Sequence, residues 1–232
     1  MSLYLILEIS SLAIPFILSF DKKVAFYTKW KILFPSILLT GILFITADIV
    51  FAKQGIWGFN PRYHSNLLIS GIPFEEWLFF VVIPYASIFT HYVFTSYFPD
   101  AFLSGKITRI ITLILLLVLT GIIILFYDRV YTLFYAALMA VILIISLFEK
   151  EPLLNRFYIT FLIILVPFFL INGILTGSFM AEEVVWYNNS EITGFRIFTV
   201  PFEDIMYCFS LILLNLMLME KFQKVIFKRL PR

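Results

Sequence analysis

The 232-residue sequence has few charged residues, two histidines and a single cysteine. Asp, Glu, Lys and Arg make up 14% of the chain and hydrophobic residues 62%, whereas a soluble domain is about a quarter charged. This balance excludes an ordinary soluble enzyme, a disordered chain and a nucleic-acid binder. The lone Cys208 excludes a disulfide framework and a multi-cysteine metal site, and two histidines exclude a His-rich di-iron site. The composition, with 28 Phe, 12 Tyr and 4 Trp, indicates a polytopic membrane protein.

Several motifs are also missing. The sequence has no GxGxxG run and no P-loop, so no nucleotide site is indicated. It has no Asp-rich run that could hold a magnesium–diphosphate group, which counts against a prenyltransferase. Its last apolar segment contains no lysine for a retinal Schiff base, because Lys221 follows the end of that segment.

Seven segments are long and apolar enough to span a membrane, since a spanning helix needs about 20 mostly apolar residues. They are 3–20, 32–52, 74–97, 110–127, 130–148, 157–176 and 201–220. The first has no basic residues before it and no small-residue cleavage site, so we expect an anchor rather than a cleavable signal peptide. The predicted fold is therefore an all-α polytopic membrane protein with seven transmembrane helices.

Lysine and arginine are distributed unevenly between the two sides. The loops after the first, third and fifth spans, together with the C-terminal tail, hold 13 of them, and the other side holds four. Because cytoplasmic loops carry the excess of Lys and Arg, we expect the N-terminus outside and the C-terminus inside. The expected location is the cell membrane, as a multi-pass protein in the cytoplasmic membrane of a prokaryote.

The sequence contains an internal repeat. The letters PFEE at 73–76 open the third span, and PFED at 201–204 open the seventh, 128 residues later; each follows a tryptophan, Trp57 or Trp186, by 15 or 16 residues. We therefore predict two three-helix repeats, which a linking helix makes parallel. The predicted parts are 1–100 (first repeat), 101–128 (linking helix), 129–222 (second repeat) and 223–232 (basic cytoplasmic tail).

No Lys or Arg lies deep in any span, but acids do. At about 1.5 Å per residue, each acid lies within roughly 8 Å of the outer end of its span. They are Glu8, Asp48, Glu75, Glu76, Glu203 and Asp204. Intramembrane acids are costly and are functional candidates by default. Without a buried cation, some of them should keep a proton, so the acidic layer indicates proton transfer.

Aromatic residues lie beside the acids. Their rings suit an apolar ligand or a developing carbocation through cation–π attraction, although an interfacial aromatic belt is the alternative. Neighbouring acids on a helix point about 100° apart, so one member of each pair can face a cavity while the other orients it. The candidate substrate-binding residues are Trp57, Trp77, Phe79, Phe80, Trp186, Tyr187 and Tyr207.

Five motifs together carry a resemblance. They are GIWGFN at 55–60, PFEEWLFF at 73–80, NGILTG at 172–177, VWYN at 185–188 and PFED at 201–204. In this combination the chain resembles the lycopene cyclase domain family, the integral-membrane lycopene β-cyclases that lack a flavin. It looks like the fused single-chain form of the two-subunit enzyme over residues 1–222. The motifs add Asn60, Asn172 and Asn188 to the candidate substrate-binding residues.

The resemblance implies that the ψ-ends of lycopene become β-rings, giving γ- and β-carotene in carotenoid biosynthesis. This isomerase (intramolecular lyase) reaction is redox-neutral and needs a carboxylic acid and a carboxylate base. We expect Glu75 and Glu203 to carry the acid–base chemistry, Glu76 and Asp204 to be their partners, and Asp48 to be an auxiliary proton relay. No metal, nucleotide or flavin cofactor is expected. The expected partners are a lipid-dissolved carotenoid, membrane lipid and other enzymes of the carotenoid pathway.

Two alternatives stay open. One is a cyclase that acts on other or elongated carotenoids and makes a different ring isomer. The other is a proton-coupled transporter or a carotenoid-binding protein without enzymatic activity. A transporter is expected to have helices that are broken at mid-membrane, whereas the spans here look continuous. The sequence leaves open which acid donates the proton.

Overall fold

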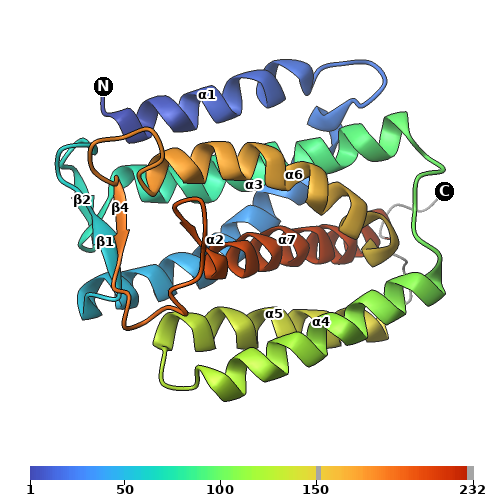
Figure 1. Cartoon of the computed structure of the whole chain (residues 1–232). Helices are drawn as coiled ribbons and strands as arrows, with labels where there is room; N and C mark the ends of the chain where they lie inside the picture. Colours follow the sequence, from blue (N-terminus) through green and yellow to red (C-terminus); the bar gives the residue numbers. More distant parts are fainter. Residues whose placement is uncertain (150–152, 229–232) are drawn as a thin grey trace.

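The computed structural model describes residues 1–149 and 153–228, which form a helical bundle (Figure 1). Within these residues there are seven α-helices, so the predicted all-α class is confirmed. They are α1 (Leu3–Leu18), α2 (Trp30–Gln54), α3 (Phe74–Tyr97), α4 (Gly105–Leu125), α5 (Val130–Phe148), α6 (Leu153–Leu175) and α7 (Phe202–Lys228), with a short 3-10 helix, η1 (Phe26–Lys29), before α2.

Six of these helices are long and apolar enough to cross a membrane, which makes the chain a multi-pass membrane protein. α1 is apolar but has only 16 residues, so the seventh crossing stays a prediction. α4 begins at Gly105 rather than at residue 110, because the Ser104 hydroxyl accepts a hydrogen bond from the Ile107 N–H and caps the helix. Lys150, Arg229 and Arg232, which contribute to the predicted orientation, and the end of the predicted basic tail lie outside the described residues.

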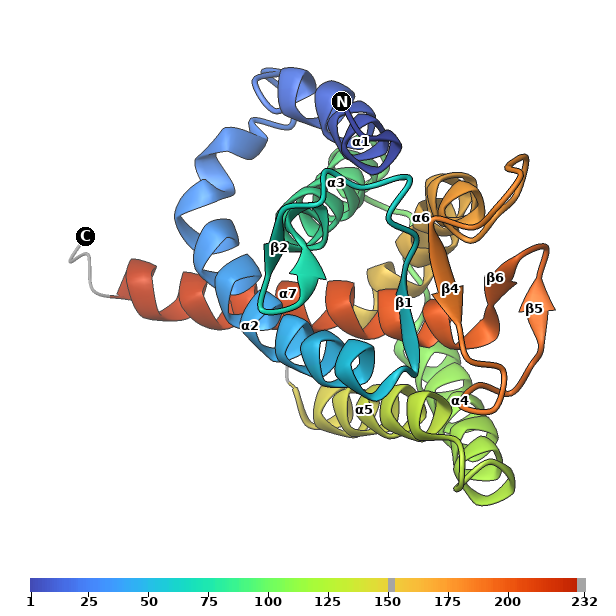
Figure 2. The ribbon, with the colours of Figure 1, turned by 90° about the vertical axis from the view of Figure 1, so that its left-hand side faces the viewer.

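The helix contacts come in two matching sets. α1 packs on α3 as α5 packs on α7, and α6 packs on α3 as α2 packs on α7. α4 lies at the margin of the bundle, against α5 and α6 (Figure 2). Its outer side exposes Leu117 and Leu125, and such an apolar surface suits contact with lipid.

Three short antiparallel sheets cover one end of the bundle. β1 (Trp57–Phe59) pairs with β4 (Val185–Tyr187) and joins two loops that are distant in the sequence, with Trp57 opposite Tyr187. β2 (Leu68–Ile69) and β3 (Ile72–Pro73) form a hairpin that leads into α3, and β5 (Arg196–Ile197) and β6 (Val200–Pro201) form one that leads into α7. The strands therefore lie above the helix ends that carry the acid pairs.

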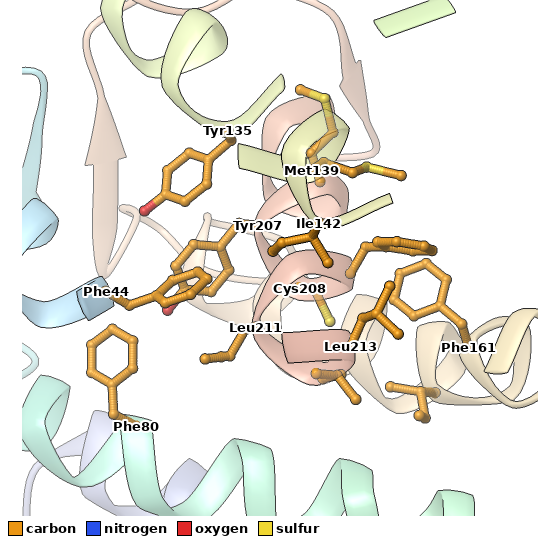
Figure 3. Packing of buried hydrophobic residues seen from close by; sticks show 14 of the residues in the cluster. Phe44, Phe80, Tyr135, Met139, Ile142, Phe161, Tyr207, Cys208, Leu211 and Leu213 are labelled. Atoms are coloured by element: carbon orange, nitrogen blue, oxygen red, sulfur yellow. The ribbon is translucent and has the colours of Figure 1, made fainter. Parts of the chain in front are cut away.

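An aromatic cluster holds four helices together beneath these strands. Phe44 of α2, Phe80 of α3, Tyr135 of α5 and Tyr207 of α7 are gathered in one place (Figure 3). The Tyr207 ring meets Phe44 edge-on at 5.3 Å and Tyr135 at 5.2 Å between centroids. Edge-to-face pairs add stabilisation beyond the burial of their area, so this cluster fixes the positions of the helices that carry the acids.

Candidate active site

A cavity of about 450 Å³ lies beneath β1 and β4, at the end of the bundle where α3 and α7 begin. This volume is in the range of small-molecule sites. Three carboxyl side chains line it, Asp48 of α2, Glu76 of α3 and Asp204 of α7, and all three are buried. Among the described residues that line the cavity there is no Lys, Arg or His. The acids therefore share one space that has no neutralising cation among its described lining residues.

Asp204 accepts three hydrogen bonds. The Tyr131 hydroxyl donates to Oδ1 at 3.0 Å, while the Asn172 amide and the Tyr187 hydroxyl donate to Oδ2 at 2.8 and 2.9 Å. Burial, and then the nearby Asp204 carboxyl, raise the pKa of the Tyr187 phenol well above its usual range, so this hydroxyl keeps its proton and stays a donor. Donors gathered around one carboxyl stabilise its negative charge.

The other two carboxyls of the cavity have fewer partners. Glu76 accepts one hydrogen bond, from the Tyr4 hydroxyl at 2.5 Å. Asp48 Oδ1 accepts a longer one of 3.3 Å from Tyr135. Asp48 Oδ2 is buried and has no hydrogen-bond partner in the described part of the chain. The surroundings therefore stabilise a negative charge less at these two carboxyls than at Asp204.

Glu75 and Glu203 are fully buried but do not line the cavity. Each accepts a backbone N–H from the loop ten residues before it, Ser65 for Glu75 (2.7 Å) and Thr193 for Glu203 (2.6 Å). A hydroxyl at the start of another helix also donates to each at 2.6 Å, from Ser2 to Glu75 and from Thr132 to Glu203. Glu203 Oε2 is buried and has no hydrogen-bond partner within the described residues. The first acid of each pair thus fastens a hairpin and a neighbouring helix to α3 or α7. Glu75 and Glu203 were the expected acid–base residues, but the second acid of each pair, Glu76 or Asp204, is the one that faces the cavity.

Five of the ten predicted substrate-binding residues line the cavity. They are Trp57, Phe79, Asn172, Tyr187 and Tyr207. The rings of Trp57 and Tyr187 stack at 6.2 Å on the side of the strands, and the ring of Phe79 lies 6.2 Å from that of Tyr207 on the side of the helices. Aromatic faces therefore surround the acids from two directions.

The other five have partners elsewhere. Asn60 donates to Glu182, Trp77 donates to the carbonyl of Ile69, Phe80 packs against Phe44, Trp186 covers Gly58, and Asn188 accepts from Ser190 in a turn. These contacts hold the loops and the core in place. The structure does not bring these five side chains to the cavity.

Sequence reasoning missed the tyrosines that bind the acids. Tyr4, Tyr131 and Tyr135 lie near the starts of α1 and α5, far in sequence from the carboxyls that they contact. Glu8 was expected in the same acidic layer, and its side chain is buried with neither oxygen hydrogen-bonded within the described residues. The available signal was positional: Ser2 and Tyr4 lie at the start of the first apolar segment, and Tyr131 and Thr132 lie at the start of the fifth.

Fold and site together define a multi-pass helical membrane protein with a buried cavity of carboxyl and aromatic side chains. The family model described as Lycopene cyclase matches residues 1–94 and 128–222. The chain belongs to the lycopene cyclase family, as the motifs predicted, and is thus an enzyme of carotenoid cyclisation whose substrate is a carotenoid in a lipid environment. No curated protein and no solved structure matches the chain.

Proposed function

We propose that the chain is a lycopene β-cyclase, an isomerase that converts the ψ-ends of lycopene to β-rings by proton-initiated cyclisation. The observation that carries this proposal is the set of three buried carboxyls, Asp48, Glu76 and Asp204, in one cavity with no cationic side chain among its described lining residues. Like charges so close to one another in a low dielectric do not all ionise. At least one carboxyl therefore keeps a proton, which it can deliver to an alkene.

Glu76 is the proposed proton donor and Asp204 the proposed base. Asp204 accepts hydrogen bonds from Tyr131, Asn172 and Tyr187, which favour its charged form. Glu76 accepts a hydrogen bond from one tyrosine. Its charged form is therefore stabilised less than that of Asp204, and Glu76 keeps its proton more readily. Because the two carboxyls come from different helices, they can lie on different sides of a bound substrate end.

The proposed reaction balances without an oxidant or a reductant. Glu76 gives a proton to C2 and leaves a tertiary cation at C1; the C5–C6 double bond attacks C1 and closes the six-membered ring with the cation at C5. Asp204 removes the proton from C6, which restores the double bond as a β-ring. The rings of Phe79, Trp57 and Tyr207 line the cavity and can stabilise these cations through cation–π attraction.

After one turnover the proton is on the wrong carboxyl, since Asp204 has gained it and Glu76 has lost it. Asp48 lines the same cavity as Glu76 and Asp204. Its unpartnered Oδ2 is free to accept or donate a proton. We assign Asp48 the return of the proton from Asp204 to Glu76, and Glu75 and Glu203 the positioning of α3 and α7.

The duplicated architecture and the orientation belong to the same proposal. The matched segments 1–94 and 128–222 are nearly equal in length and leave out α4, which supports repeats at 1–100 and 129–222 with a linking helix at 101–128. The matching helix contacts support it as well. Seven spans with the N-terminus outside would place the acids near the outer face of the cell membrane of a prokaryote.

Expression in a lycopene-accumulating bacterium, followed by chromatography of the pigments, tests the activity. The chain should convert lycopene to γ- and β-carotene, and the inactive control is Glu76→Gln. Rings of another isomer would show that the base removes a different proton than the one at C6. Uncyclised lycopene, despite membrane insertion of the protein, would contradict the proposal.

A further inference from the structure

The carboxyl cavity continues as a groove along α3. Its lining residues on this helix include Glu76, Phe79, Ile83, Ala86 and Thr90, which recur at helical spacing on one face. From Glu76 to Thr90 the stripe extends about 21 Å at a rise of 1.5 Å per residue. The groove is therefore long, with the acids at one end and the small side chains of Ala86 and Thr90 toward the other.

The two walls of the groove are α1 and α6, which contact each other weakly and both pack on α3. At its edges Ile14 of α1 is 66% exposed and Leu170 of α6 is 61% exposed, so the groove opens sideways between these helices. Each wall contains a proline that lines the groove, Pro15 or Pro167. An internal proline removes a helix hydrogen bond and bends the helix, which keeps the two walls from closing on each other.

Three of the four serine and threonine hydroxyl groups that line the groove are already used, and the fourth belongs to Ser87. Ser10 donates to the carbonyl of Ile6 (2.7 Å), Ser11 to that of Leu7 (2.8 Å), and Thr90 to that of Ala86 (2.9 Å). A polar ligand would find few free donors here, because these three hydroxyls each donate to a carbonyl of their own helix. The groove suits a slender apolar molecule.

The equivalent space in the other half of the bundle is closed. It would lie between α2 and α5, over α7. There Phe51 meets Phe134 at 5.2 Å and Tyr131 at 5.8 Å, and Phe44 meets Tyr135 (Figure 3). Of the two walls, α5, which stands where α1 stands in the first half, contains no proline, and α2 contains Pro35. Aromatic rings fill this second space, so the two halves are not equivalent as channels.

We propose that the groove between α1 and α6 is the channel for the unreacted polyene, and that Ala86 and Thr90 determine its passage. This inference rests on the proposed function. One ψ-end lies at the carboxyls, the conjugated chain follows α3, and the rest of the molecule leaves between α1 and α6 into the lipid. The identity of the far end is then unimportant, because it lies outside the protein.

Substitutions along the groove test the channel with substrates of different length. The variants are Ala86→Phe and Thr90→Phe, and the control is Val166→Phe on the lipid-facing side of α6, where the side chain is 72% exposed. The substrates are lycopene and a shortened polyene with one ψ-end that stops before Thr90. We expect Thr90→Phe to slow lycopene about tenfold or more, as overpacking does, and to leave the short polyene unchanged. Ala86→Phe should slow both, and Val166→Phe neither.

Activity on the short polyene shows that Thr90→Phe and Val166→Phe fold. If the unaltered chain cyclises lycopene and Thr90→Phe cyclises both substrates equally well, the channel is overturned while the proposed function stands. If the unaltered chain cyclises neither substrate, the proposed function fails instead. A direct readout uses Thr90→Cys in phosphatidylcholine vesicles, where Cys208 is buried. Lycopene should slow labelling of this thiol by a maleimide, and an unchanged rate would also overturn the channel.

Discussion

The Tyr4 hydroxyl at the start of α1 donates a hydrogen bond of 2.5 Å to Glu76 at the start of α3. In the other half of the bundle, Tyr131 at the start of α5 donates to Asp204 at the start of α7. Tyr4 thus joins α1 to the second acid of the motif that opens α3, and Tyr131 joins α5 to the second acid of the motif that opens α7. The second acids, rather than the first, are therefore the ones held at the cavity.

Glu76→Gln and Asp204→Asn should each abolish cyclisation, because an amide cannot transfer the proton and general acid–base groups contribute about 10²–10⁴-fold. Glu75→Gln and Glu203→Gln should keep most of the activity, since an amide oxygen still accepts the loop N–H, and should lower thermal stability instead. Pigment analysis and thermal inactivation of purified protein separate the two effects. Full activity of Glu76→Gln would remove this residue from the mechanism.

Either cavity mutation alone should stop cyclisation at both ends of lycopene. Glu76 and Asp204 line one cavity, so each end of the substrate needs both carboxyls. Chromatography should show neither γ- nor β-carotene with Glu76→Gln or with Asp204→Asn. Accumulation of the one-ring product in one of these variants would indicate that each half acts on its own.

Tyr131→Phe and Tyr187→Phe should each slow cyclisation about tenfold or more, because a hydrogen bond to a charged group contributes about 1.5–3 kcal/mol. Each change removes one of the donors to Asp204. The control is Tyr158→Phe, whose hydroxyl bonds Thr112 away from the cavity. Initial rates in lipid vesicles measure the effect, and equal rates for all three variants would argue against Asp204 as the base.

Topology is testable with reporters. A reporter fused after the last residue should be cytoplasmic, and one inserted at Asn188 should be external. The reason is that the excess of Lys and Arg lies on the side of the membrane that holds the C-terminal tail. A third reporter before α1 should be external if this 16-residue helix crosses the membrane. A cytoplasmic signal there would reduce the crossings to six.

Gly58→Ala should destabilise the cover over the cavity. A Cβ atom at Gly58 would lie 2.5 Å from Cζ2 of the Trp186 ring across the β1–β4 pair, and overpacking of this kind costs about 1–3 kcal/mol. The double variant Gly58→Ala with Trp186→Ala should recover part of the loss. Gly105→Ala is the control, since nothing lies within 4 Å of its added Cβ. Thermal inactivation should be fastest for Gly58→Ala, slower for the double variant and slowest for Gly105→Ala.

Much of the fold could be predicted from the sequence. The bounds of α3 and α5 agree with the predicted 74–97 and 130–148, because polar or turn-forming residues interrupt the apolar runs at both ends. The five motifs together, including those at 73–76 and 201–204, identified the family. The positions of the acids near helix starts follow from the same motifs, since these positions are local.

The tertiary structure decided which acid of each pair faces the cavity. Glu75 and Glu76 are neighbours whose directions differ by about 100°, and the rotation of α3 depends on the contacts of Ser2, Ser65 and Tyr4 with these carboxyls. Such contacts join residues up to 73 positions apart, so no local pattern contains them. The tertiary structure also decided which space is open. Large rings meet between α2 and α5 and fill that space, whereas prolines of α1 and α6 and small side chains of α3 line the open groove.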